Sequence, residues 1–213
     1  MYSESDAQDW FKKWEGDIEH MYLDTVGVVT VGVGAALFAA SDATALAFVV
    51  RAGGAAATAA QITTDYDEVK KQTKGQIASA YKQYTKCDLP QAKRDELLLA
   101  KIRGFDARLK ARLPDFASYP DPAQLGLLEM IYNLGESGLF DKFPSFIKAV
   151  KAKDWTTASS ESNRIGPSKA RNDATKALFT KAASETHTAE PWLPNAIWNL
   201  WPFGKPGGWN WPM

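Results

Sequence analysis

The sequence predicts an α+β fold that is mostly helical, with a small β-hairpin near the N-terminus. Three observations support this class. Of the 213 residues, 45% are hydrophobic and 23% are charged, which is typical of a globular protein with a substantial core. β-branched and aromatic residues gather between residues 20 and 33. After Gly34, apolar residues recur at helical spacing over most of the chain.

A short amphipathic helix is expected over residues 5–14, because its aromatic residues fall on one side. Ser5 or Asp6 is the expected N-cap, since a side-chain oxygen there can accept a free backbone N–H. Gly16 is expected to end the helix.

Two short runs rich in β-branched and aromatic residues follow, at residues 20–24 and 28–33. A Thr-Val-Gly sequence at residues 25–27 separates them and favours a turn. We therefore expect a β-hairpin directly after the first helix.

The rest of the chain up to residue 184 predicts a series of helices. Gly53 and Gly54 separate the first two, and Pro90 stands where a first-turn proline is tolerated. Residues 116–122, with two prolines, predict a loop. Helices are expected at residues 43–50 (capped by Ser41 or Asp42), 55–62, 65–86, 90–114, 123–134, 144–152, 155–163 and 168–184.

The overall charge balance argues against nucleic-acid binding. The chain holds 25 basic and 25 acidic residues, so no global positive charge would attract a polyanion. Residues 69–112 do carry twelve bases against four acids. Such a stretch indicates either solvated helix faces or a surface that contacts an anionic partner.

The sequence gives no sign of a disulfide, a targeting segment or a membrane span. Cys87 is the single cysteine, which fits synthesis in the cytoplasm. The N-terminus is acidic and polar, so we expect no signal peptide. The uncharged run at residues 26–41 is shorter than the roughly 20 residues that a spanning helix needs, so stable membrane insertion is not expected.

The composition changes near the C-terminus. Residues 187–213 contain five of the eight tryptophans and repeated prolines, which exclude a regular helix there. This Trp/Pro-rich tail has three possible roles: it docks on the protein's own apolar surface, it binds a partner, or it stacks against sugar rings.

Glu15, Asp24 and Thr30 form the set that indicates chemistry. Glu15 ends the first helix, Asp24 ends the first strand, and Thr30 lies in the second. A hairpin packed against a helix end can bring two carboxyl groups and a hydroxyl together. Cleavage of a glycosidic bond needs such a set, because one carboxyl protonates the leaving oxygen and the other assists the attacking group.

The surrounding residues match a longer pattern, E-G-x5-Y-x-D-T-x-G-x2-T-x-G-x-G. It resembles the signature of the phage-type lysozymes, glycoside hydrolase family 24, and is closest to pesticin-like muramidases and lysozyme domains of secreted antibacterial effectors. The matching positions are Glu15, Gly16, Tyr22, Asp24, Thr25, Gly27, Thr30, Gly32 and Gly34.

A second block, L-L-E-M-I-Y-N-L-G-E-S-G at residues 127–138, resembles the central buried helix of that family. Arg171 and Phe179 are similar to residues of its arginine helix. The resemblance covers about residues 10–185 and is weak between the two blocks. Ala35 departs from the pattern, because phage members carry histidine there.

The resemblance implies a role for each site residue. Glu15 would be the general acid, Asp24 the second carboxylate, Thr30 a ligand of the attacking water, and Arg171 an anchor for Glu15. The family inverts the anomeric carbon, which calls for a carboxyl separation of roughly 6.5–9.5 Å. Further residues are expected to contact substrate, namely Tyr22, Gly34, Ala36, Tyr132 and Asn133.

The resemblance also implies a lysozyme-like fold over residues 1–186. We expect a β-containing lobe at about residues 15–64, a helical lobe formed by residues 65–186 with the N-terminal helix, and a cleft between them. Since His20 and His187 belong to no recognisable ligand set, we expect no metal and no cofactor.

The function that follows is a muramidase, which hydrolyses the β-1,4 bond between N-acetylmuramic acid and N-acetylglucosamine. We expect a monomer made in the cytoplasm that acts on peptidoglycan strands of a target periplasm or cell wall after delivery. An immunity protein or secretion component is a further expected partner. The alternatives are a catalytically silent module that binds peptidoglycan or a partner protein, and a membrane-active toxin.

Overall fold

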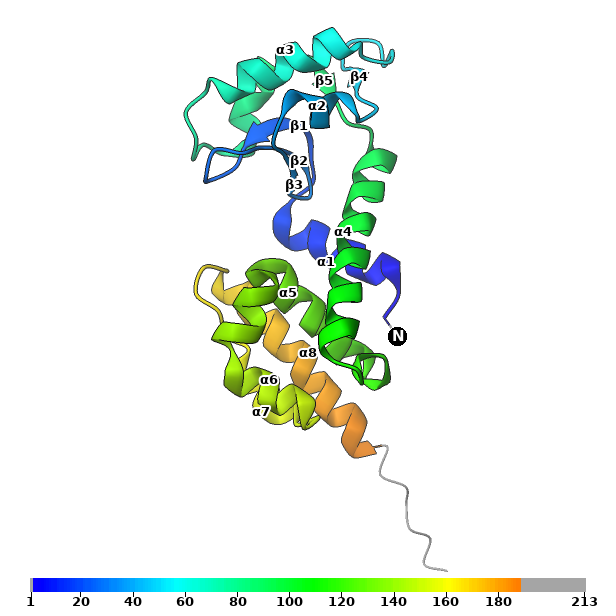
Figure 1. Ribbon diagram of the computed structural model, residues 1–213, viewed down its shortest axis with the longest axis vertical. Coiled ribbons are helices and arrows are strands. Elements are labelled where there is room, and N and C mark those ends of the chain that lie inside the picture. The colour runs from blue at the N-terminus through cyan, green and yellow to red at the C-terminus, as the bar shows by residue number, and fades with distance from the viewer. Residues whose placement is uncertain (1, 189–213) are drawn as a thin grey trace, which may run out of the picture.

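The computed structural model describes residues 2–188 and shows an α+β chain that is mostly helical (Figure 1). The fold class predicted from the sequence is confirmed at this level. The helices are α1 (Glu4–Glu15), α2 (Ala40–Thr44), α3 (Ala59–Lys70), α4 (Gln91–Arg112), α5 (Asp121–Lys142), α6 (Pro144–Lys151), α7 (Trp155–Glu161) and α8 (Lys169–Thr188). The strands are β1 (Ile18–Leu23), β2 (Val29–Gly32), β3 (Ala35–Leu37), β4 (Val49–Val50) and β5 (Cys87–Asp88), and the 3₁₀ helices are η1 (Ala78–Tyr84) and η2 (Phe116–Ser118).

The buried apolar residues form two clusters, which we call the sheet core and the helical core. Helix α4 runs between the two parts of the molecule (Figure 1), where Leu97 packs against the sheet core and Leu98 belongs to the helical core. The sheet core consists of Met21, Leu23, Val29, Val31, Leu37, Ala43, Phe48, Ile62, Tyr66, Val69, Tyr81, Cys87 and Leu89. This core extends to Leu89, beyond the lobe boundary predicted at residue 64.

Helix α1 belongs to the helical core, into which it buries Ala7 and Phe11. Its N-cap is Ser3, whose hydroxyl accepts the backbone N–H of Asp6 at 3.1 Å. The helix thus begins before the expected cap at Ser5 or Asp6, since Ser3 already supplies the oxygen that the free N–H groups require.

The predicted hairpin is confirmed as β1 and β2, and a third antiparallel strand extends it. Strand β3 pairs with β2, in a region where the sequence predicted helices only. Gly34, with a φ of 69°, lets the chain turn back tightly between these strands, a conformation that other residues rarely adopt. The sheet order is β1-β2-β3.

Residues 43–50 do not form the predicted helix. Helix α2 ends at Thr44, and Val49 and Val50 pair with Asp88 and Cys87 as strand β4. The apolar periodicity of this stretch was compatible with a helix, but two adjacent β-branched residues also suit a strand. Pairing with a partner nearly 40 positions away decides the outcome, and no local pattern contains that information.

The predicted helices at 55–62 and 65–86 are also wrong. A single helix, α3, is capped by Thr58, whose hydroxyl accepts from the N–H of Gln61. Asp65 does not start a helix. It is buried in α3, and its carboxylate accepts the backbone N–H groups of Lys86 and Cys87 at 2.8 and 2.7 Å. These two hydrogen bonds fix strand β5 against the helix. Residues 78–84 form the 3₁₀ helix η1.

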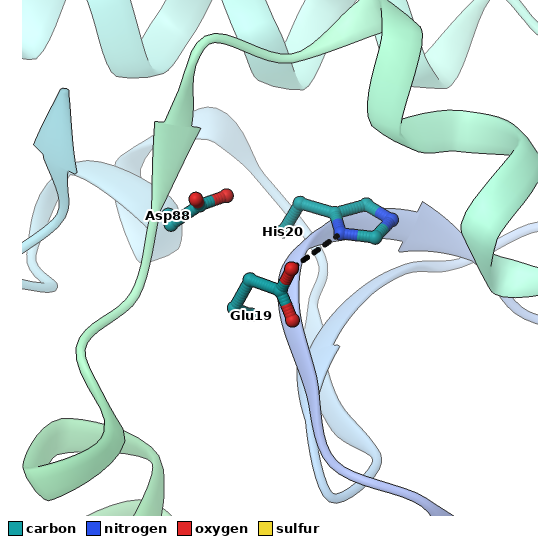
Figure 2. A group of neighbouring side chains, drawn as sticks. All are labelled: Glu19, His20 and Asp88. Carbon is teal, nitrogen blue, oxygen red and sulfur yellow. Dashed lines mark ion pairs between the residues drawn. The ribbon is translucent and has the colours of Figure 1, made fainter. Parts of the chain in front are cut away.

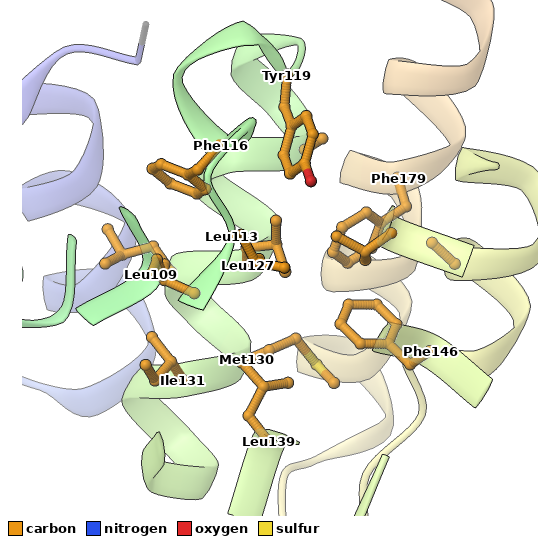
Figure 3. Close-up of a cluster of buried hydrophobic side chains, with 14 of the residues drawn as sticks. Leu109, Leu113, Phe116, Tyr119, Leu127, Met130, Ile131, Leu139, Phe146 and Phe179 are labelled. Atoms are coloured by element: carbon orange, nitrogen blue, oxygen red, sulfur yellow. The ribbon is translucent and has the colours of Figure 1, made fainter. Parts of the chain in front are cut away.

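The predicted helices after Pro90 are confirmed, with shifted ends. Helix α5 is the centre of the helical core, where it packs against α4, α6 and α8 (Figure 3). It extends past the predicted end through a kink at Gly135, which has a φ of 71°. Gly126 lets α8 approach closely, because a Cβ at this position would lie only 2.7 Å from the Phe179 ring.

No helix in residues 2–188 combines the length and the apolar character that crossing a membrane would require. Most of the predicted Trp/Pro-rich tail, residues 189–213, lies outside the described residues. The three readings of that tail therefore stay predictions.

Candidate active site

Glu15 is held at the junction of the first and last helices. It is the final residue of α1, which ends because Gly16 adopts a φ of 76°. Arg171 of α8 donates from Nη2 to Glu15 Oε1 at 2.6 Å. The Glu15 side chain remains 28% exposed, so it is anchored and still accessible. The predicted contact between Arg171 and Glu15 is confirmed.

Behind this ion pair lies a buried carboxylate that the sequence analysis did not single out, Glu129 of α5. Its side chain is fully buried, as is that of Arg164. Arg164 Nη1 and Arg171 Nε both donate to Glu129 Oε1 at 2.7 Å. Trp10 Nε1 and Arg171 Nη2 donate to Oε2 at 2.9 and 3.1 Å. Every oxygen of this carboxylate is thus doubly hydrogen-bonded.

The four charges of this network balance, since two carboxylates face two guanidinium groups. Arg164 also donates to Thr175 Oγ1 at 2.7 Å. Burial lowers the pKa of Arg171, but the hydrogen bonds and negative charges of Glu129 and Glu15 outweigh it and raise the pKa overall. A charge buried this deeply is tolerated only when it is paired and fully hydrogen-bonded. The network therefore fixes the position of the Arg171 guanidinium group, which contacts Glu15.

Asp24 organises the turn between β1 and β2. Its Oδ1 accepts the backbone N–H groups of Val26 and Val28 at 3.0 and 2.8 Å. A carboxylate that bonds its own backbone two residues ahead is a common turn device. Asp24 is half-buried and its position is set by the loop itself.

Three of the predicted site residues form a row across the sheet. Tyr22 pairs with Thr30 across β1 and β2, and Thr30 pairs with Ala36 across β2 and β3. Directly opposed residues point to the same face of an antiparallel sheet. Thr30 is 3% exposed and its hydroxyl donates to Val28 O at 3.1 Å, while Ala36 is exposed at the end of the row.

Tyr22 connects the row to both carboxylates. Burial raises its pKa to about 12, and the negative charges of Glu15 and Asp24 add to the increase. The charges of both carboxylates thus act on the same phenol. Strand β1, which carries Tyr22, also connects the two acids, because it begins shortly after Glu15 and ends next to Asp24.

The titration of Tyr22 tests this arrangement. Because the folded pKa is raised from 10.0 to about 12, keeping Tyr22 neutral contributes stability that is complete below pH 10 and is lost as the pH rises through about 12. We expect a tyrosinate absorbance titration of the wild type to contain a component near pH 12 that Tyr22→Phe lacks. In Glu15→Gln that component should move to lower pH. An unchanged midpoint in Glu15→Gln would contradict the proximity of the two side chains.

Tyr132 joins α5 to the turn between β2 and β3. Its hydroxyl donates to Val33 O at 2.8 Å, and its ring stacks on Phe11 with a centroid distance of 4.0 Å. Burial, followed by the charge of Glu15, raises its pKa. Asn133 is exposed at the next position of α5. No hydrogen bond within residues 2–188 connects Asn133 to the other site residues, so its substrate role stays a prediction.

Lys101 of α4 also belongs to this site, although the sequence analysis did not select it. Its Nζ donates to Gly34 O at 3.2 Å and lies 4.1 Å from the centroid of the Tyr132 ring. Burial lowers the pKa of Lys101, and the nearby negative charge of Glu15 opposes the change. Its ammonium group is thus a cation close to the anchored glutamate.

The site therefore holds a partly exposed carboxyl group at a helix end and a second carboxylate in a hairpin turn. Helix α4 adds a lysine and helix α5 adds a tyrosine. Such a set can transfer protons and can donate hydrogen bonds to a polyhydroxylated ligand. No protein-family model matches the chain, and no curated protein sequence matches it.

Proposed function

We propose that the protein is a muramidase with a lysozyme-like fold, which hydrolyses the β-1,4 bond between N-acetylmuramic acid and N-acetylglucosamine in peptidoglycan. The observation that carries this proposal is the partly exposed Glu15, anchored by Arg171 at the end of α1, with Asp24 held by the turn of the hairpin that follows. The match of residues 15–34 to the phage-type lysozyme pattern adds support from the sequence.

Glu15 would act as the general acid. Its anchoring by Arg171 fixes one carboxylate oxygen, so the other is available to protonate the oxygen of the leaving sugar. The buried Glu129 network makes this orientation rigid, which favours a single productive geometry.

Asp24 would activate a water molecule on the opposite face of the sugar ring, giving inversion at the anomeric carbon. The turn hydrogen bonds use Oδ1, so Oδ2 would be available as the basic oxygen. Thr30 would help to hold this water, because its hydroxyl oxygen can accept a further hydrogen bond.

The remaining residues would bind the glycan. Gly34 and Ala36 would leave room for a sugar ring close to the backbone, and Tyr22 would offer aromatic surface. Tyr132, whose ring packs against Phe11 and Lys101, would contact the glycan at its edge beside the turn that it holds. Lys101 uses one ammonium proton on Gly34 O, so its other donors can reach a sugar oxygen.

Product analysis with Asp24→Asn tests the proposal. Asparagine retains the oxygen that accepts from Val26 and Val28, so the turn should persist while the negative charge is lost. We expect the wild type to release muropeptides with reducing N-acetylmuramic acid ends from isolated peptidoglycan, as identified by mass spectrometry. Asp24→Asn should release them at least about 10²-fold more slowly.

Each other outcome has a distinct meaning. Reducing N-acetylglucosamine ends would show cleavage of the wrong bond and refute the muramidase assignment. No release by the wild type would refute the hypothesis that the protein is an enzyme. It would favour a catalytically silent binding module. Equal release by the wild type and Asp24→Asn would refute the role of Asp24. Circular dichroism spectra of the two proteins should coincide, which verifies that the fold is unchanged.

A further inference from the structure

Three side chains that the proposed mechanism does not use converge beside the sheet core (Figure 2). Glu19 and His20 come from β1, and Asp88 comes from β5. One potential ligand atom of each lies within 4.8 Å of the others. Figure 2 shows the two carboxylates and the imidazole Nδ1 directed toward a common space.

An irregularity in β1 explains how neighbouring residues reach the same side. Successive side chains of a regular strand point to opposite faces. The pairing of β1 with β2 is interrupted between Ile18 and Tyr22, which indicates a bulge that can redirect a side chain. The backbone N–H of Leu89 donates to Glu19 O at 2.7 Å and so brings Asp88 alongside.

The histidine has a defined tautomer and an unused nitrogen. His20 Nε2 lies 2.9 Å from Ala78 O, and a carbonyl can only accept, so Nε2 carries the proton. Nδ1 then presents its lone pair to the cluster. His20 is 3% exposed, and Nδ1 has no hydrogen-bond partner within residues 2–188. Glu19 Oε1 lies 3.9 Å from Nδ1.

We propose that Glu19, His20 and Asp88 bind a divalent transition-metal ion of the zinc class, through His20 Nδ1 and one oxygen of each carboxylate. Imidazole nitrogen with carboxylate oxygen is a ligand set that zinc accepts. Metal-binding histidines usually donate their second N–H to a carbonyl or carboxylate, as His20 does to Ala78 O. This departs from the expectation, drawn from the sequence, that neither histidine belongs to a ligand set.

Two basic side chains already contact the carboxylates, so a metal ion must either displace them or bind beside them. Lys82 Nζ lies 2.7 Å from Glu19 Oε1, and Arg51 donates to both oxygens of Asp88 at 2.7 and 2.9 Å. Lys82 is 47% exposed, so it can move into solvent when a metal ion takes its place. Arg51 can remain, because each carboxylate oxygen has a second lone pair.

The expected role of the ion is structural, because it would connect β1 to β5 within the sheet core. Strand β1 leads directly into the turn that carries Asp24. An ion that binds only the folded form would stabilise it by an amount that rises with the logarithm of the free ion concentration above Kd. It would not contact Glu15, so activity and metal binding are separate properties of the molecule.

Calorimetric titration of the full chain with Zn²⁺ tests the proposal. The experiment uses a His187→Gln background, which removes the only other histidine of the sequence. We expect one equivalent to bind, and we expect Glu19→Gln and Asp88→Asn each to weaken binding at least about tenfold. Lys82→Met should strengthen binding, because it removes the cation that competes for Glu19. Glu68→Gln, which removes an exposed carboxylate paired with Lys71, is the matched control and should leave binding unchanged.

Nitrogen NMR of the His20 ring gives a second measurement that is independent of folding defects in the variants. Zn²⁺ should shift the Nδ1 resonance and leave the Nε2 proton in place. Absence of binding, equal affinity in Glu19→Gln and Asp88→Asn, or a His20 Nδ1 resonance that responds to pH but not to Zn²⁺ would each overturn the proposal.

Discussion

Replacing Glu15 with glutamine is expected to reduce peptidoglycan hydrolysis by about 10²- to 10⁴-fold, the range that a positioned general acid contributes. The amide oxygen can still accept from Arg171 Nη2, and the side chain is partly exposed, so the fold should change little. The loss should therefore appear in kcat, because the transferable proton has been removed and the glycan contacts remain.

Glu4→Gln is the matched control for that variant. Glu4 lies in the same helix and forms an exposed pair with Arg103. Its replacement should leave the rate of reducing-end release within about twofold of the wild type, since such pairs contribute little. If Glu15→Gln retained more than a tenth of the wild-type rate, Glu15 would not be the general acid.

Replacing Glu129 with glutamine should lower the free energy of unfolding by about 3–5 kcal/mol, because removing one partner of a buried ion pair leaves the other uncompensated. Arg164 is fully buried and would lose the one charged partner that it has within residues 2–188. Arg171 would lose the carboxylate that holds its Nε, so Glu15 would be anchored less firmly. Denaturant unfolding followed by circular dichroism measures the change.

Glu136→Gln serves as the comparison on the same helix. Glu136 pairs with Arg112 at 2.9 Å, and both side chains are more than a third exposed. Solvent screening makes this pair worth at most about 1 kcal/mol. A Glu129→Gln protein as stable as Glu136→Gln would show that the buried network does not hold the helices together.

The sequence was most informative where local chemistry decides the structure. The apolar periodicity of α4 to α8 and the prolines at the starts of α4, α5 and α6 are local signals, so these elements could be predicted. The hairpin could be predicted as well, because its turn and its β-branched strands are adjacent in the chain. The contact between Arg171 and Glu15 was expected only through the family resemblance, since 156 positions separate the two residues.

Residues 36–89 show where such reasoning failed. Strands β4 and β5 have two residues each and exist through mutual pairing, so neither carries a recognisable pattern alone. Asp65 could be mistaken for a helix cap because a short polar side chain suits that position, whereas its actual partners are 21 and 22 positions away.

Glu129 could have been selected from the sequence, since it is the only charged residue between Pro122 and Gly135. A lone acid in an apolar helix must be paired when it is buried. Its partners Arg164 and Trp10 could not be identified, because they lie 35 and 119 positions away in the chain. Lys101 gave no signal at all, being one of many bases in α4.

The joining of α1 to α8 has a consequence for how the protein folds. The first helix is completed by Glu15, but its charged partner Arg171 is translated near the end of the described chain. Closing so long a loop carries an entropic penalty before any contact compensates it, which slows folding. A nascent chain that ends before α8 contains Glu15, Asp24 and Thr30 without the guanidinium that orients the acid. Assembly of the site therefore waits until α8 has been synthesised.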